Sequence, residues 1–119
     1  MTWPCNAHTT ASDALWAGVP IVTYTGPTFA SRVASSLLHA VGLPQFACAD
    51  IASYRTRILE LARDDAQRLA LKDHLVQART SAPLFDSERR VRDLEALYER
   101  MWARVATGLP PDHLSASAR

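Results

Sequence analysis

The segment PIVTYT at residues 20–25 constrains the fold more than any other stretch of the sequence. It is rich in β-branched and aromatic residues, Gly18 precedes it and Gly26-Pro27 follows it, so it is expected to form a strand. Helical patterns lie on both sides of it. A helix that feeds a strand within a few residues is half of a β-α-β unit, which indicates an α/β fold.

Hydrophobic periodicity predicts five helices and a second, short strand at residues 45–49. We expect Thr9 or Thr10 to cap the first helix, which Gly18 closes near residue 17, and Thr28 to cap the second. Asp50 is expected to cap the third helix to about residue 62, and the fourth follows to about residue 78. The last is capped by Asp86 or Ser87 and stopped by Gly108 and Pro110-Pro111. The expected apolar faces are Phe29, Val33, Leu37 and Val41 on the second helix, and Val91, Leu94, Tyr98, Met101, Trp102 and Val105 on the last.

These elements predict a helix-rich α/β chain with very few strands. One or two parallel strands do not make a complete sheet, so we expect the chain to be the tail of a larger α/β domain, as a truncated, mis-started or stand-alone product. Residues 1–108 are expected to be the C-terminal portion of that domain. Residues 109–119 are expected to form a flexible tail.

Composition argues against several classes of protein. The 119 residues carry a net charge of +1, so neither a nucleic acid nor an anionic membrane is expected as a partner. No run approaches the roughly 20 apolar residues of a membrane span, and no signal peptide is visible. Cys5 and Cys48 are too few for a disulfide framework and lack metal-ligand spacing, which predicts reduced thiols and a cytoplasmic location.

A polar cluster lies just ahead of the first predicted helix. In open α/β sheets ligands bind beyond the carboxyl ends of the strands, where the first turn of a helix offers free N–H groups and a positive dipole end to phosphate. His8, Thr9 and Thr10 stand at such a position and can add further donors. Asp13 lies on the same helical face and is suited to accept from ribose hydroxyls. By spacing alone the cluster is a candidate anion site, and with Asp13 it could read a nucleoside diphosphate.

An ordinary helix start is the competing interpretation. The spacing from Thr10 to Asp13 also fits a capping box, in which the acid reaches back to the start of the helix. Arg32 could face the same crevice or be a solvated, structural arginine. No residue in the sequence is a convincing catalytic base.

The string CNAHTTASDALWAGVPIVTYTGPTFASRVASSLLHAVGLPQ, at residues 5–45, resembles the C-terminal catalytic region of the O-linked N-acetylglucosaminyltransferase family, glycosyltransferase family 41. The family pattern is close to N-G-H-T-T-x-x-D-x-L-W-x-G-x-P-x-V-T, followed by G-x-T-x-A-S-R-V. Ala7 replaces the glycine before the histidine, which slightly restricts the backbone. SAPLFD, LEALYERMW and PPDHL extend the resemblance over nearly the whole chain.

The resemblance implies a GT-B fold, two Rossmann-like halves facing each other across a cleft, with this chain part of the C-terminal half. It implies transfer of N-acetylglucosamine from UDP-N-acetylglucosamine to Ser or Thr of a protein or peptide acceptor, with inversion and without a metal or other cofactor. His8, Thr9 and Thr10 would then contact the donor diphosphate, and Asp13 the ribose. The family's uracil contacts, acceptor site and other half have no match in these residues, so the isolated chain is expected to be inactive.

Two alternatives stay open at this point. One is a related GT-B transferase that uses another UDP-sugar or an Asn acceptor. The other is a non-catalytic nucleotide-binding or helical remnant, in which the polar cluster only caps a helix.

Overall fold

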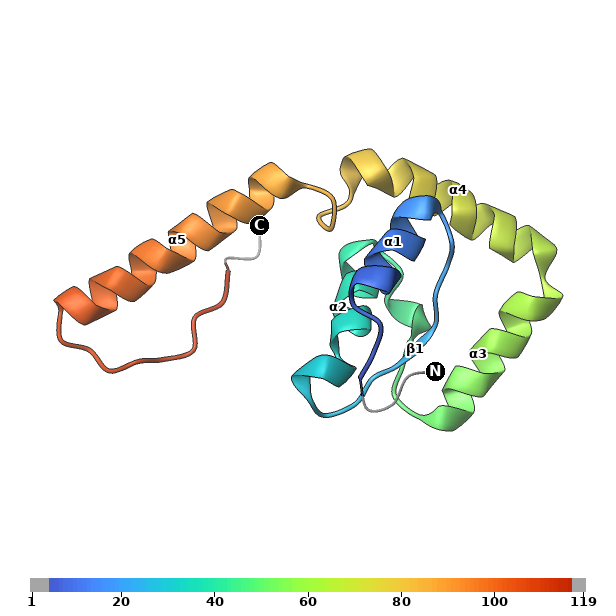
Figure 1. Cartoon of the computed structure of the whole chain (residues 1–119), viewed down its shortest axis with the longest axis horizontal. Helices are drawn as coiled ribbons and strands as arrows, with labels where there is room; N and C mark the ends of the chain where they lie inside the picture. The colour runs from blue at the N-terminus through green and yellow to red at the C-terminus, as the bar shows by residue number, and fades with distance from the viewer. Residues whose placement is uncertain (1–4, 117–119) are drawn as a thin grey trace. The chain divides into compact units, whose positions relative to one another are not determined.

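The computed structural model describes residues 5–116, so the last three residues of the predicted tail lie outside the described residues. The contacts divide the chain into two compact units, one through Phe85 and one from Asp86. In chain order the elements are α1 (Thr9–Ala17), β1 (Thr23–Tyr24), η1 (Phe29–Ser31, a 3-10 helix), α2 (Val33–Ala40), η2 (Pro44–Phe46, a 3-10 helix), β2 (Ala47–Cys48), α3 (Ile51–Arg63), α4 (Asp65–Ser81) and α5 (Ser87–Ala106) (Figure 1).

Strands β1 and β2 pair in parallel within the first unit. Thr23 lies opposite Ala47 and Tyr24 opposite Cys48. η1, α2 and η2 connect the two strands, so the predicted order of strand, helix and short strand is present. Both strands are shorter than predicted, because ladder pairing and not β-propensity alone decides how far a strand extends.

The core of the first unit gathers side chains from several helices and from the segment before β2. Leu15 of α1, Leu38 of α2, Phe46 and Leu75 of α4 are almost completely buried in it. α1 packs against α2 and α4, while α3 packs against both strands (Figure 1). Each such side chain contributes about 1.5–3 kcal/mol through burial, so α4 is part of the fold and not an appendage.

The second predicted helix begins later than its sequence pattern indicates. Thr28 is a cap, as predicted, but it caps the three-residue η1, where its Oγ1 accepts a hydrogen bond from the Ser31 amide at 3.3 Å. Arg32 follows with φ −115° and ψ −13°, and α2 starts only after it. This break shifts the helical phase, so the prediction that Phe29 is buried is wrong, and its side chain is 83% exposed. The buried residues of α2 are Ala34, Ser35 and Leu38.

Aspartates cap the three later helices. The Oδ1 atoms of Asp50, Asp64 and Asp86 each accept a hydrogen bond from the backbone N–H three residues ahead, at 2.7, 2.8 and 2.8 Å. The caps predicted for α3 and α5 are therefore confirmed. α4 runs on to Ser81, beyond the predicted end near residue 78.

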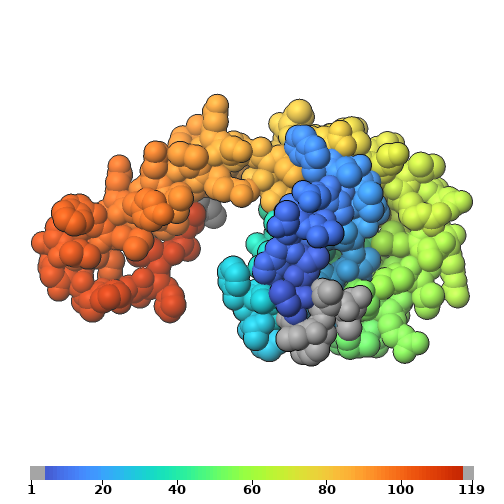
Figure 2. Space-filling view, viewed as in Figure 1, coloured from blue at the N-terminus to red at the C-terminus, as the bar shows by residue number. Residues whose placement is uncertain are grey.

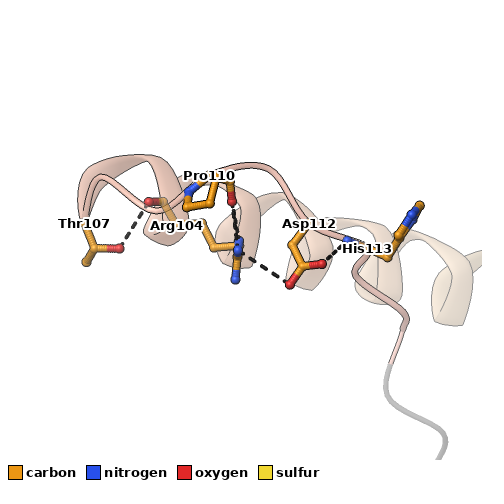
Figure 3. Close-up of polar contacts among 5 residues, drawn as sticks. All are labelled: Arg104, Thr107, Pro110, Asp112 and His113. Atoms are coloured by element: carbon orange, nitrogen blue, oxygen red, sulfur yellow. Dashed lines mark hydrogen bonds and ion pairs between the residues drawn. The ribbon is translucent and has the colours of Figure 1, made fainter.

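The second unit consists of α5 and the residues that follow it. The Arg104 guanidinium donates to the Pro110 carbonyl oxygen at 2.8 and 3.2 Å and lies 3.5 Å from an Asp112 carboxylate oxygen (Figure 3). These contacts hold the segment of Pro110 to Asp112 against the end of α5. The flexible tail and the domain boundary at residue 108 stay predictions.

The apolar side predicted for α5 is formed by residues that are all exposed. Val91, Leu94, Tyr98, Met101, Trp102 and Val105 are 45–72% exposed. Periodicity therefore identified residues that share a side of the helix but not a buried face. Among residues 5–116, no helix is both long and apolar enough to cross a membrane.

Candidate functional site

Asn6 anchors the loop that leads into α1. Its buried side-chain Nδ2 donates to the Ser31 carbonyl at 2.7 Å and to the Tyr24 carbonyl at 3.4 Å. Its backbone N–H donates to the Ala30 carbonyl at 2.8 Å. Because Tyr24 ends β1, these bonds place the start of α1 at the carboxyl end of that strand. Ligands of α/β sheets bind at this edge.

His8, and neither threonine, is the N-cap residue of α1, and no side chain makes a capping hydrogen bond there. The prediction that Thr9 or Thr10 caps the helix is therefore wrong, as is the alternative of a capping box from Thr10 to Asp13. The ring Nε2 of His8 lies 3.2 Å from the Ala30 carbonyl oxygen. With this bond and the Asn6 anchor, the helix starts one or two residues earlier than the spacing indicates.

The first turn of α1 leaves backbone donors available. The first bond of the helix runs from the Ser12 amide to the His8 carbonyl at 3.1 Å, and the amides of Thr9 and Thr10 find no acceptor within the described part of the chain. The turn contains no acidic residue. Free amides at the positive end of the helix dipole attract an anion, which an aspartate cap like those of α3, α4 and α5 would repel.

The four predicted site residues lie together at this helix start. Thr9, Thr10 and Asp13 are exposed and His8 is half-buried. Asp13 follows the two threonines by one turn, on the same side of α1. Figure 2 shows this segment, in dark blue, at the surface of the first unit. The arrangement can offer N–H and O–H donors to an anion and, one turn further on, a carboxylate to hydroxyl groups.

Two pockets lie near these residues. Thr10 lines a pocket of about 280 Å³ between α1 and β1, together with Asn6 and Tyr54. Arg32 lines a different pocket, of about 910 Å³, with Phe29. Within residues 5–116 no hydrogen bond or ion pair joins Arg32 to the four site residues, and its place in the same crevice stays a prediction.

The role of Asn6 as an anchor is not predicted by the sequence analysis. Its side-chain acceptors lie 18 and 25 residues away along the chain, so no local pattern could reveal them. Over the described residues, no group of three or more His, Cys, Asp or Glu side chains is arranged to hold a metal ion.

A parallel α/β unit with a donor-rich helix start at the end of its strand belongs to a class of α/β architecture that binds nucleotides and other phosphates. Comparison with known proteins identifies the family. The model for glycosyl transferase family 41 matches residues 1–94. The chain therefore belongs to glycosyl transferase family 41, and the resemblance to the O-linked N-acetylglucosaminyltransferases is confirmed.

Individual relatives agree with this assignment. The chain is 38% identical over 111 residues to the UDP-N-acetylglucosamine–peptide N-acetylglucosaminyltransferase of Caenorhabditis elegans, covering 93% of this chain and 10% of that protein. It is 39% identical over 110 residues to the probable enzyme of the same name, SEC, of Arabidopsis thaliana, covering 92% and 11%. The structure of a mutant O-GlcNAc transferase of Thermobaculum terrenum matches with a TM-score of 0.80 and 37% identity, over 85% of this chain and 19% of that one. The chain thus spans about a tenth of the length of its curated relatives.

Proposed function

We propose that this chain supplies part of the donor site of a UDP-N-acetylglucosamine-dependent protein O-glycosyltransferase. Membership of the family supports the reaction, and the names of the relatives support the donor and the peptide acceptor. The observation that carries the site is the uncapped start of α1 at the carboxyl end of β1, where His8, Thr9, Thr10 and Asp13 lie together.

The donor diphosphate would lie over the amides and hydroxyls of Thr9 and Thr10. His8 adds a ring donor beside them, more strongly when the ring is charged. Departure of UDP builds negative charge on the diphosphate, and fixed donors aimed at that charge lower the barrier. Asp13, one turn further along, would accept hydrogen bonds from the ribose hydroxyls. A reaction without a metal or other cofactor is part of this proposal, as the family resemblance implies.

The first unit would belong to the C-terminal Rossmann-like half of a GT-B fold. The parallel β1-α2-β2 unit and the match to an O-GlcNAc transferase chain support this placement. The donor sugar and the Ser or Thr acceptor would be held by regions that the longer relatives contain. The two free thiols, Cys5 and Cys48, support a cytoplasmic setting.

Calorimetric titration with UDP tests the site directly. We expect His8→Ala and Asp13→Ala each to weaken binding about tenfold, because each removes a hydrogen bond to a charged or polar group of the ligand. His113→Ala in the second unit and Asp73→Ala in α4 are matched controls, because they replace the same residue types at exposed positions outside the proposed site, and both should keep the wild-type affinity. Absence of UDP binding to the wild type at millimolar concentration, or equal losses in all four variants, would contradict the proposal.

A further inference from the structure

Asn6 uses its side chain in a way that fixes its own orientation. Both acceptors of its Nδ2, the carbonyls of Ser31 and Tyr24, can only accept hydrogen bonds. Rotating the side-chain amide by half a turn would place its Oδ1 against the carbonyl oxygens of Ser31 and Tyr24. The side chain is therefore locked, and it locks η1 to the loop before α1.

The Ala30 carbonyl in η1 receives two donors from that loop. The backbone nitrogen of Asn6 lies 2.8 Å from this carbonyl oxygen, and the ring Nε2 of His8 lies 3.2 Å from it. A carbonyl cannot donate, so Nε2 carries the hydrogen and the neutral ring is the Nε2–H tautomer. The Phe29 ring meets the imidazole edge-on, with ring centroids 6.4 Å apart.

We propose that Asn6 is a positioning residue for nucleotide binding. By holding η1 in place, it sets the Ala30 carbonyl that fixes His8 as the Nε2–H tautomer, which leaves Nδ1 as the ring nitrogen available to a diphosphate. His8 then donates to the ligand through Nδ1–H as the imidazolium, without giving up its bond to Ala30. The role toward a ligand rests on the proposed function, whereas the tautomer does not.

Long-range proton–nitrogen spectra of the imidazole rings test this in the ¹⁵N-labelled full chain, recorded at rising pH until the ring signals no longer change. The wild type should show His8 as a single Nε2–H tautomer, and Asn6→Ala should average the two tautomers. His74 is an internal control, because its Nε2 lies 2.7 Å from the Val41 carbonyl, away from Asn6. Thr25→Val is the matched variant. It removes the 2.6 Å hydrogen bond between the Thr25 and Ser35 side chains and leaves the bonds of the loop before α1 in place.

Two results would overturn the positioning role. One is a wild-type His8 that populates both tautomers. The other is an Asn6→Ala chain that keeps the wild-type tautomer. If Asn6→Ala also alters the His74 signals, the fold has changed, and the test is then made with Asn6→Leu, which has nearly the same size and removes both side-chain donors without placing an oxygen against the two carbonyls.

Titration with UDP separates this inference from the proposed function. Asn6→Ala should weaken UDP binding about tenfold, while Thr25→Val leaves it unchanged. A wild type that shows the single tautomer but binds no UDP refutes the nucleotide site and leaves Asn6 as the residue that orders His8. A wild type that binds UDP with an averaged tautomer refutes the positioning role alone.

Discussion

Ser31 links three segments of the chain through one small side chain and its backbone. Its fully buried Oγ donates to the Thr28 carbonyl at 2.8 Å and accepts from the Thr28 amide at 2.9 Å. Its carbonyl accepts from the Asn6 side chain and from the Gly26 amide. The end of β1, the turn η1 and the loop before α1 therefore depend on this residue.

Replacing Ser31 by Ala should lower the free energy of unfolding by about 1–3 kcal/mol, because its buried hydroxyl makes two hydrogen bonds to the Thr28 backbone and both are lost. Urea denaturation measures the change. Ser36→Ala is the same substitution at an exposed position of α2 and should stay within about 0.5 kcal/mol of wild type. Equal effects of the two substitutions would argue against this account of η1.

Local chemistry predicted the residues at the start of α1 but not what holds them. His8, Thr9, Thr10 and Asp13 followed from donor and acceptor types at helical spacing. The prediction of the α1 cap was wrong because the His8 ring bonds to the Ala30 carbonyl, 22 residues away along the chain. Spacing within one helix carries no information about such a partner.

Among the helices, α3 shows how a cap responds to pH. The pKa of Asp50 is lowered from its ordinary value of 3.8, chiefly by the backbone hydrogen bond that it accepts from Ser53. The charged form is thus favoured in the folded state. Its contribution to stability is complete above the unfolded-state pKa and is lost as the pH falls through the lower, folded-state pKa.

Asp50→Ala should lower the melting temperature at pH 7, since the Ser53 amide loses its acceptor. Asp50→Asn should retain most of the stability, because asparagine caps helices about as well as aspartate. The difference in melting temperature between the wild type and Asp50→Ala should become smaller as the pH falls below 3.8. Melting curves at several pH values measure it, and a difference that widens in acid would show that the carboxylate does not cap α3.

Leucines of the helices can be compared by one substitution at two positions. Leu38→Ala in α2 should lower the free energy of unfolding by about 2–5 kcal/mol, because it leaves a cavity in the core. Leu69→Ala in α4, where the side chain is 63% exposed, should change stability by about 0.5 kcal/mol or less. Denaturant titration of both variants measures the two values, and similar losses would contradict the assignment of the core.

The sequence predicted the order of the helices well, and the phase of α2 badly. Aspartates before apolar runs mark helix starts by a mechanism that acts within one turn, so the caps of α3 and α5 could be predicted. The phase of α2 depends on the 3-10 turn that Thr28 and Ser31 close. A 3-10 turn advances three residues per turn instead of 3.6, which displaced Phe29 from the predicted face.

For the molecule as a whole, the proposed site holds only the diphosphate and the ribose. Transfer also requires a sugar and an acceptor hydroxyl held at reacting distance. We therefore expect no transfer of labelled N-acetylglucosamine from UDP-N-acetylglucosamine to a peptide by the 119-residue chain alone. Counting label in the peptide, against a reaction without protein, measures this, and signal above that background would show that these residues suffice.

The α/β class and the family could be predicted for the whole chain, because a strand between helices and a long shared pattern are properties of the sequence itself. The sequence could not predict what covers a given side of a helix. The apolar residues of α5 repeat as a buried face would, yet they are exposed. Periodicity shows which side chains share a side, and only packing decides whether that side is covered.

The two cysteines differ in one respect that gives the native chain a built-in reporter. Cys5 is exposed and precedes the Asn6 anchor, whereas Cys48 is buried in β2. Thiol-specific dyes react with accessible thiolates, so a fluorophore can be attached at residue 5 while the folded core protects the second thiol. Its emission would follow the arrival of a nucleotide at the start of α1 without a single substitution.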